Sequence, residues 1–231
     1  MTETNNQNAY LYKSAAFMRS GLADVQSKVN ALYKIEELED YIEVKDSPLE
    51  HVQAALAPLV AQVNDFLDYA STVNDTMELS LEEVDIYALL DGVLTIADQL
   101  AEQKGGITIQ EEIEEDLPTI DADPTRLSQA LLNYLHNAIK FTDKGTVTVR
   151  VSLEGENVIF EVEDTGIGIF ASDQEKVFEP FETLLVDKED PRLGFGLGLK
   201  ITEHIIDLHD GETWFESEYD MGSSFFFSVP L

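Results

Sequence analysis

Two segments near the amino terminus carry apolar residues that recur in alternating steps of four and three. One segment runs from Leu11 to Leu32 and the other from Val52 to Val73. A period of about 3.5 residues, sustained along both segments, is typical of helices that pack almost parallel, as in coiled coils and four-helix bundles. Two such helices alone enclose a thin core, so a dimer that completes four helices is the economical arrangement. The pattern therefore predicts a helical hairpin over residues 9–75 that forms a homodimeric four-helix bundle.

The pattern changes near Leu79, and the rest of the chain mixes helical and strand-like periods. Capping signals and apolar spacing predict helices at residues 85–103, from Asp123-Pro124 onward, and at 199–209. Alternation of apolar and polar residues predicts strands at residues 107–113, 146–153, 157–163, 213–216 and 224–229. We therefore expect an α+β fold, in which the helical hairpin is followed by an α/β sandwich domain over residues 79–231.

The charge balance and the lack of cysteine exclude several classes of function. The 231 residues include 46 acidic and 14 basic side chains, for a formal net charge of −32 at pH 7. Such a charge opposes binding to nucleic acid or to anionic membranes, and adaptation to high salt is one explanation for it. Without cysteine, the chain has no disulfides and no thiolate chemistry. No apolar run is long enough to span a bilayer and the amino terminus lacks a signal-peptide core, so we expect a cytoplasmic protein.

The stretch from Leu131 to Thr142 predicts a helix with an unusual polar side. Its apolar residues follow the helical spacing of a buried stripe. The opposite side carries Asn133, Asn137 and Lys140. A merely solvated face in so acidic a chain would be rich in glutamate. Two amides and a lysine therefore indicate a ligand that needs neutral oxygen donors together with a cation.

Three further stretches combine glycine or aromatic residues at short spacing. Asp164-x-Gly166-x-Gly168 follows a predicted strand, where glycines let the backbone approach a flat ligand and the aspartate can accept from a ring amine. Phe178-Glu-Pro-Phe181 is a pattern that more often reflects plain packing. Gly194-x-Gly196-Leu197-Gly198 precedes a predicted helix, whose first N–H groups suit phosphate. Taken singly, each glycine stretch is also compatible with an ordinary turn.

Taken in order, the four stretches resemble the ATP-binding domain of sensor histidine kinases. The resemblance covers residues 79–231 and includes Asp123-Pro-x-Arg-Leu before the first stretch and Asp210-Gly-Glu after the last. It implies that residues 182–193 form a mobile lid, with Arg192 or Lys188 as the cation that faces phosphate. The ATP-binding residues that it implies are Asn133, Asn137, Lys140, Asp164, Gly166, Gly168, Phe178, Phe181, Arg192, Gly194, Gly196, Leu197 and Gly198.

The resemblance also implies a role for the polar side of the helix. In the family, an amide at the position of Asn137 holds Mg²⁺, a hard cation that prefers oxygen ligands. Asn133 and Lys140 would lie near the triphosphate, where lysine offsets phosphate charge. Asp164 would accept a hydrogen bond from the adenine amine, and residues 194–198 would cradle the phosphates.

One position distinguishes between reaction types. The related ATP-binding fold of gyrase-like and chaperone-like ATPases carries a glutamate where Asn133 stands, and that glutamate is the general base that activates water. Its absence here argues against an ATP hydrolase. It favours phosphoryl transfer to a protein side chain instead.

The first helical segment resembles the dimerisation and phosphoacceptor domain of the same kinases, but it lacks the acceptor. Ala23 occupies the histidine position, Lys28 the proline position, and Asp24 the position of the companion acid. Alanine has no nucleophilic atom, so autophosphorylation at this position is blocked. The chain is then a natural relative that lost the acceptor, an engineered variant, or a case in which the acceptor is elsewhere, with His51 as the other histidine of this region.

These observations predict a dimeric, histidine-kinase-like protein of two-component signalling that binds Mg²⁺ and ATP. Its expected partner is the receiver domain of a response regulator, docking near Ala23. Two alternatives remain open at this level. One is a phosphatase of the phosphorylated regulator, with Asp24 and Ser27 orienting water, and the other is a nucleotide-gated binding module without catalysis.

Overall fold

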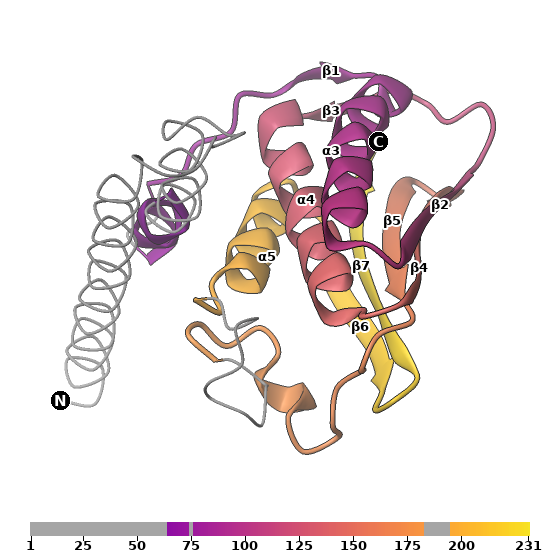
Figure 1. Ribbon diagram of the computed structural model, residues 1–231. Helices are drawn as coiled ribbons and strands as arrows, with labels where there is room; N and C mark the ends of the chain where they lie inside the picture. Colours follow the sequence, from indigo (N-terminus) through magenta and orange to yellow (C-terminus); the bar gives the residue numbers. More distant parts are fainter. Residues whose placement is uncertain (1–63, 74–75, 183–194) are drawn as a thin grey trace, which may run out of the picture. The chain divides into compact units, whose positions relative to one another are not determined.

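The computed structural model describes residues 64–73, 76–182 and 195–231 (Figure 1). By its internal contacts the chain divides into two compact units, and the second, Leu67–Leu231, contains nearly all of the described residues. The predicted hairpin of residues 9–75 lies outside the described residues except for its end, residues 64–73, which is helical. The predicted site residues that lie outside are Ala23, Asp24, Ser27, Arg192 and Gly194.

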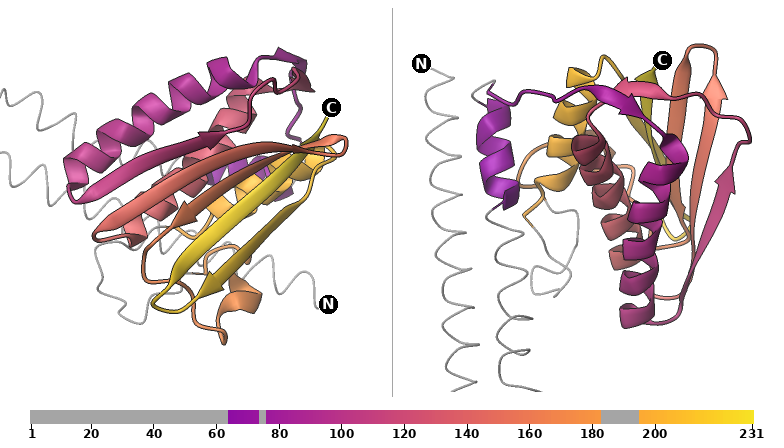
Figure 2. Two further views of the ribbon diagram at one scale, coloured as in Figure 1. Left: turned by 90° about the vertical axis from the view of Figure 1, so that its right-hand side faces the viewer. Right: turned by 90° about the horizontal axis from the view of Figure 1, so that it is seen from above.

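A mixed sheet of five strands forms one layer of the second unit (Figure 2). The strand order is β2-β4-β5-β7-β6. Strand β2 pairs parallel with β4, and all other neighbours are antiparallel. The strands are β2 (Ile107–Ile113), β4 (Gly145–Glu154), β5 (Asn157–Asp164), β6 (Thr213–Glu218) and β7 (Gly222–Pro230).

Helices cover one face of this sheet (Figure 2). They are α3 (Ile86–Lys104), α4 (Pro124–Phe141) and α5 (Gly198–Leu208). The Asp85 side chain caps α3 by accepting from the N–H groups of Tyr87 and Ala88. Asp123 caps α4 in the same way, with a proline in the first turn. A carboxylate at this position satisfies N–H groups that the helix itself leaves unpaired, which explains why both helices begin where they do.

The core lies between the helices and the covered face of the sheet. Alternate residues of β4, namely Val147, Val149 and Val151, point into it and are at most 1% exposed. Phe160 of β5 and Phe227 of β7 stack there with ring centroids 4.6 Å apart. Full burial of an aliphatic or aromatic side chain contributes about 1.5–3 kcal/mol to folding. The apolar stripe predicted for residues 131–142 supplies the helical side of this core through α4.

The predicted α+β layering of the second domain is confirmed, and each helix or strand predicted within residues 79–231 matches an observed one within two residues at each predicted end. The small antiparallel sheet of β1 (Glu82–Val84) and β3 (Ile120–Ala122) was not predicted. Strands of three residues are too short to display an alternating pattern. The parallel pairing of β2 with β4 was not predicted either, because α4 and more than thirty residues separate these strands in the sequence.

Asp123 and His209 join the start of α4 to the end of α5. The Asp123 carboxylate accepts from the N–H of Ser80 (2.9 Å), and the backbone N–H of Asp123 donates to His209 Nε2 (3.0 Å). The other ring nitrogen, Nδ1, donates to the carbonyl oxygen of Ile205 (2.7 Å). His209 is only 6% exposed, and both its nitrogens are committed to the backbone. His209 therefore has a structural role at this junction.

Within the unit Leu67–Leu231, the helical residues at its start contact α4 through Asp68. Its carboxylate accepts from Arg126 Nη1 (3.1 Å) and from Gln129 Nε2 (2.7 Å). The neighbouring Tyr69 ring is 9% exposed and lies edge-on to Phe181, with centroids 5.2 Å apart. These contacts connect the end of the second predicted hairpin helix to α4 and to the Phe178–Phe181 stretch.

Candidate functional site

Helix α4 carries the polar side that the sequence predicted. Asn133 Nδ2 donates to the carbonyl oxygen of Gly198 (3.1 Å) and to Thr202 Oγ1 (3.2 Å), so this amide links α4 to the start of α5. Asn137, one turn further on, is half-buried, and no hydrogen bond joins its side chain to another described residue. The Lys140 ammonium lies 5.0 Å from the ring centroid of Phe141. Asn137 is thus the amide whose oxygen remains available to a ligand.

Asp164 ends β5 as a buried carboxylate that is 6% exposed. Its Oδ1 accepts from the N–H of Gly166 (2.8 Å). Burial raises the pKa of the Asp164 carboxyl from 3.8 to about 6, the N–H groups of Gly166 and Ser223 act against this rise, and the nearby Glu163 charge adds to it. A buried carboxylate with a raised pKa is often found at functional sites, because a structural carboxylate is usually better compensated.

The two glycines after Asp164 are required by close backbone approaches. A Cβ atom on Gly166 would lie 2.6 Å from the carbonyl oxygen of Phe141, the last residue of α4. Gly168 has φ +63°, and a Cβ atom there would lie 2.0 Å from the carbonyl oxygen of Glu218. Both distances are shorter than any real contact, so only glycine lets this loop pack between α4 and the β6–β7 turn.

The aromatic stretch and the last glycine stretch meet through backbone contacts. The N–H of Phe181 donates to the carbonyl oxygen of Gly196 (2.9 Å). Gly196 has φ +63°, and a Cβ atom there would lie 2.2 Å from the carbonyl oxygen of Glu182. Leu197 is buried behind this contact, and Gly198 opens α5. Phe178 packs against Phe215 of β6, with ring centroids 6.0 Å apart.

The structure therefore connects all four predicted stretches. The Asp164–Gly168 loop packs on the end of α4, α4 holds Gly198 through Asn133, and Gly196 contacts the Phe178–Phe181 stretch. Together they bring a buried hydrogen-bond acceptor, a half-buried amide and a helix amino terminus to one side of the domain. This set fits a ligand with an amine-bearing ring and a phosphate group, and the amide oxygen fits Mg²⁺.

Lys104 was missed by the sequence analysis. Its ammonium, at the end of α3, donates to the carbonyl oxygens of Ile139 (2.7 Å), Lys140 (2.8 Å) and Thr142 (2.8 Å). These carbonyls lie in the last turn of α4 or just beyond it, where a helix leaves its acceptors unpaired and where a cation is favoured. Lys104 thus holds the part of α4 that carries Asn137 and Lys140. A single lysine in a helix end gives no signal in the sequence.

Comparison with known proteins agrees with this geometry. Residues 122–231 match the family described as histidine kinase-, DNA gyrase B- and HSP90-like ATPases. The circadian input-output histidine kinase CikA of Synechococcus elongatus is 35% identical over 175 residues, which make up 74% of this chain and 23% of that protein. Full-length ShkA in complex with AMPPNP is similar with a TM-score of 0.68 and 31% identity, over 97% of this chain and 45% of the ShkA chain. Histidine kinase ThkA in complex with response regulator TrrA shares the fold with a TM-score of 0.65 and 22% identity, over 98% of this chain and 63% of that one.

The fold and these matches define the second unit as an ATPase domain of the class shared by histidine kinases, DNA gyrase B and HSP90. Within that class, its similarity to CikA and ShkA identifies it as a histidine-kinase-type ATP-binding domain. The chain spans only 9%, 23% and 21% of the length of three curated relatives that it matches, so those proteins contain much sequence beyond the shared part. In the described part of the chain, no helix is both long and apolar enough to cross a membrane.

Proposed function

We propose that this domain binds ATP with Mg²⁺ and that the chain is a histidine-kinase-like protein of two-component signalling. The observation that carries the proposal is the buried Asp164 carboxylate, which ends β5 beside a glycine loop that packs closely on the end of α4. Holding a carboxylate in this environment costs free energy, as its raised pKa indicates. An amine donor from an adenine ring would compensate the ionised carboxylate and recover part of that cost.

The other residues divide the rest of the nucleotide between them. Asn137 would contribute an amide oxygen to Mg²⁺, whose further ligands would be phosphate oxygens and water. Lys140 would offset phosphate charge. The N–H groups at the start of α5, from Gly198 on, would face the phosphates, and Arg192 and Gly194 are proposed to complete this side. Bound ATP would supply the phosphoryl group for transfer to a protein side chain.

The signalling role rests on the resemblance of the first helical segment and on the relatives. With Ala23 at the acceptor position, the chain would not phosphorylate itself there. The homodimer through residues 9–75 and a receiver domain as partner are part of the same proposal. Support for the partner comes from ThkA, which shares the fold and was solved in complex with response regulator TrrA. No observation on the described residues favours the phosphatase or the nucleotide-gated binding module over this proposal.

Calorimetric titration of the full chain with ATP, in the presence and absence of Mg²⁺, tests the site. Asp164→Asn should weaken ATP binding about tenfold or more, because it replaces a charged acceptor with an amide. Asn137→Asp should weaken Mg²⁺–ATP binding by a similar factor, because a carboxylate at this position would repel the triphosphate. Matched controls are Asp121→Asn on β3 and Asn157→Asp at the start of β5, both at exposed positions away from the site. Unchanged affinity in both site variants would rule out the assignment.

A further inference from the structure

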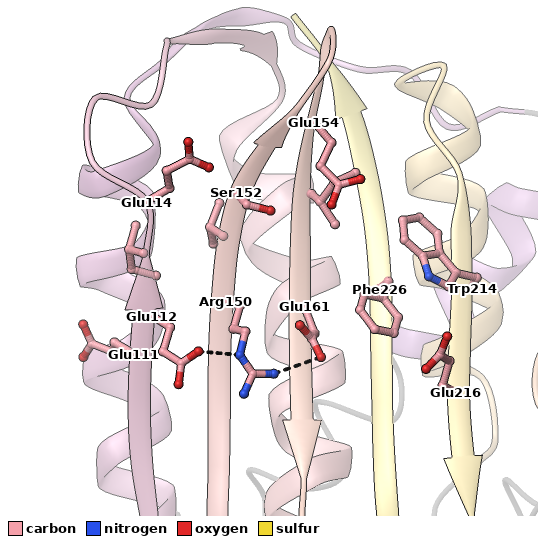
Figure 3. A pocket seen from close by; sticks show the side chains of 13 residues that line it. Glu111, Glu112, Glu114, Arg150, Ser152, Glu154, Glu161, Trp214, Glu216 and Phe226 are labelled. Atoms are coloured by element: carbon pink, nitrogen blue, oxygen red, sulfur yellow. Dashed lines mark hydrogen bonds and ion pairs between the residues drawn. The ribbon is translucent and has the colours of Figure 1, made fainter.

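The face of the sheet opposite the helices is open, and no described element covers it (Figure 2). One row of directly paired residues crosses all five strands on this face (Figure 3). Its members, in strand order, are Glu112, Arg150, Glu161, Phe226 and Trp214. Over β2, β4 and β5 the row is charged, with two glutamates on either side of Arg150, and over β7 and β6 it is aromatic. A shallow hollow of about 700 Å³ lies over this row. This open face is distinct from the ATP site.

The open face keeps a negative charge after its internal pairing. Arg150 binds Glu112 (2.6 Å), Glu161 (3.1 Å) and Glu163 (2.7 Å), so one cation is shared by three carboxylates. Glu154 and Glu216 line the same hollow and form no ion pair with a described residue. The hollow is therefore bordered by carboxylates that still lack a cation.

The aromatic half is unusual for a solvent-facing surface. The rings of Trp214 and Phe226 are parallel within 2°, with centroids 5.1 Å apart. Trp214 is 36% exposed and is the only tryptophan of the chain. An exposed indole beside unpaired carboxylates offers a cation both a π face and a counter-charge. The whole chain is acidic, so the carboxylates on this face could reflect that general acidity. The exposed aromatic pair is not explained by it.

We propose that this face binds an extended, arginine-bearing segment of a partner protein. A guanidinium would stack on Trp214, and further basic side chains would pair with Glu154 and Glu216. Five strands at about 4.8 Å spacing make the row about 19 Å long, which is the reach of about six residues of extended chain. Nucleic acid and anionic lipid carry the wrong charge for this face, and a second copy of the chain would present the same negative surface.

The test titrates the full chain with a peptide of about eight residues that alternates arginine and serine, so that the arginines share one side. Trp214 fluorescence reports binding directly, because no other tryptophan contributes. We expect a saturable signal at low salt, and none with a matched glutamate–serine peptide. The double variant Glu154→Gln/Glu216→Gln should weaken binding about fivefold. Trp214→Leu, followed by calorimetry, should weaken it about threefold.

The control double variant Asp91→Asn/Asp98→Asn removes the same charge from exposed positions of α3, on the other side of the sheet. It should leave the affinity for the arginine peptide nearly unchanged. Equal weakening by both double variants would show general attraction to a polyanion and would overturn the proposal. Absence of saturable binding would overturn it as well. The proposal would also be overturned if the Trp214 signal changed with protein concentration alone and sedimentation showed dimerisation through this face. The occupant of the face would then be a second copy of the chain.

Discussion

Asp164→Asn should stabilise the nucleotide-free protein at pH 8 while it weakens ATP binding. In the folded protein the carboxylate is 6% exposed, and burial raises its pKa from 3.8 to about 6. A folded-state pKa above the unfolded value means that the folded state binds the proton more tightly. The contribution of this group to stability is therefore complete below about pH 4 and is lost as the pH rises through 6.

The size of the effect follows from the pKa difference. A rise from 3.8 to about 6 corresponds to about 3 kcal/mol at pH 8, where the carboxylate is ionised in both states. The amide of the variant carries no charge and can still accept from the N–H of Gly166, but its NH₂ group meets the N–H of Ser223 without a hydrogen bond. Loss of one hydrogen bond costs about 1 kcal/mol. The variant should therefore be more stable by about 2 kcal/mol at pH 8, and the difference should vanish or change sign near pH 4.

Urea unfolding followed by Trp214 fluorescence measures this in the full chain. Trp214 lies in β6, so its signal follows the unit that contains Asp164. A gain of 2 kcal/mol would move the urea midpoint up by about 1 M at pH 8. Asp121→Asn, at an exposed position of β3, should change the midpoint little at either pH. A variant that is less stable than the unmodified protein at pH 8, or a difference that does not depend on pH, would refute this reasoning.

Three further predictions address the frame of the site and the missing acceptor. Lys104→Met should lower the free energy of unfolding by about 2 kcal/mol in urea and weaken Mg²⁺–ATP binding in calorimetry, because three carbonyls at the end of α4 lose a charged donor. The control variant Lys144→Met, at an exposed position, should change neither quantity. Gly196→Ala should lower ATP affinity about tenfold, whereas Gly155→Ala should not. Both positions have a positive φ of similar size (+63° and +65°), but only at Gly196 would the added Cβ atom meet backbone. Equal effects of the two variants would show that the backbone conformation, and not this contact, decides the affinity. Ala23→His should become labelled by radioactive ATP, and acid should remove the label, as expected for phosphohistidine. If the unmodified protein is labelled instead, and the label disappears in His51→Ala, the acceptor is His51.

Local signals in the sequence were enough to predict the helices and strands of the second domain and the four stretches that carry the proposed site residues. Helices α3 and α4 begin at carboxylates that the capping pattern marks, and the strands show the alternation that a sheet with one buried face imposes. Asn133 and Asn137 were predicted as site residues because amides are unusual on the polar side of a helix in so acidic a chain, and Asp164 because two glycines follow it at short spacing after a strand. Such features depend on neighbours within a few residues, so they can be found without coordinates.

Contacts between distant segments were decided only by the tertiary structure. The parallel pairing of β2 with β4, the Lys104 ammonium at the end of α4, and the row from Glu112 to Trp214 each join residues that lie far apart in the chain. The raised pKa of Asp164 belongs to the same group, because burial is a property of the packed domain and not of the Asp-x-Gly motif. The motif predicts which side chain would meet a ligand, whereas packing sets the free-energy cost that a ligand would relieve at that side chain.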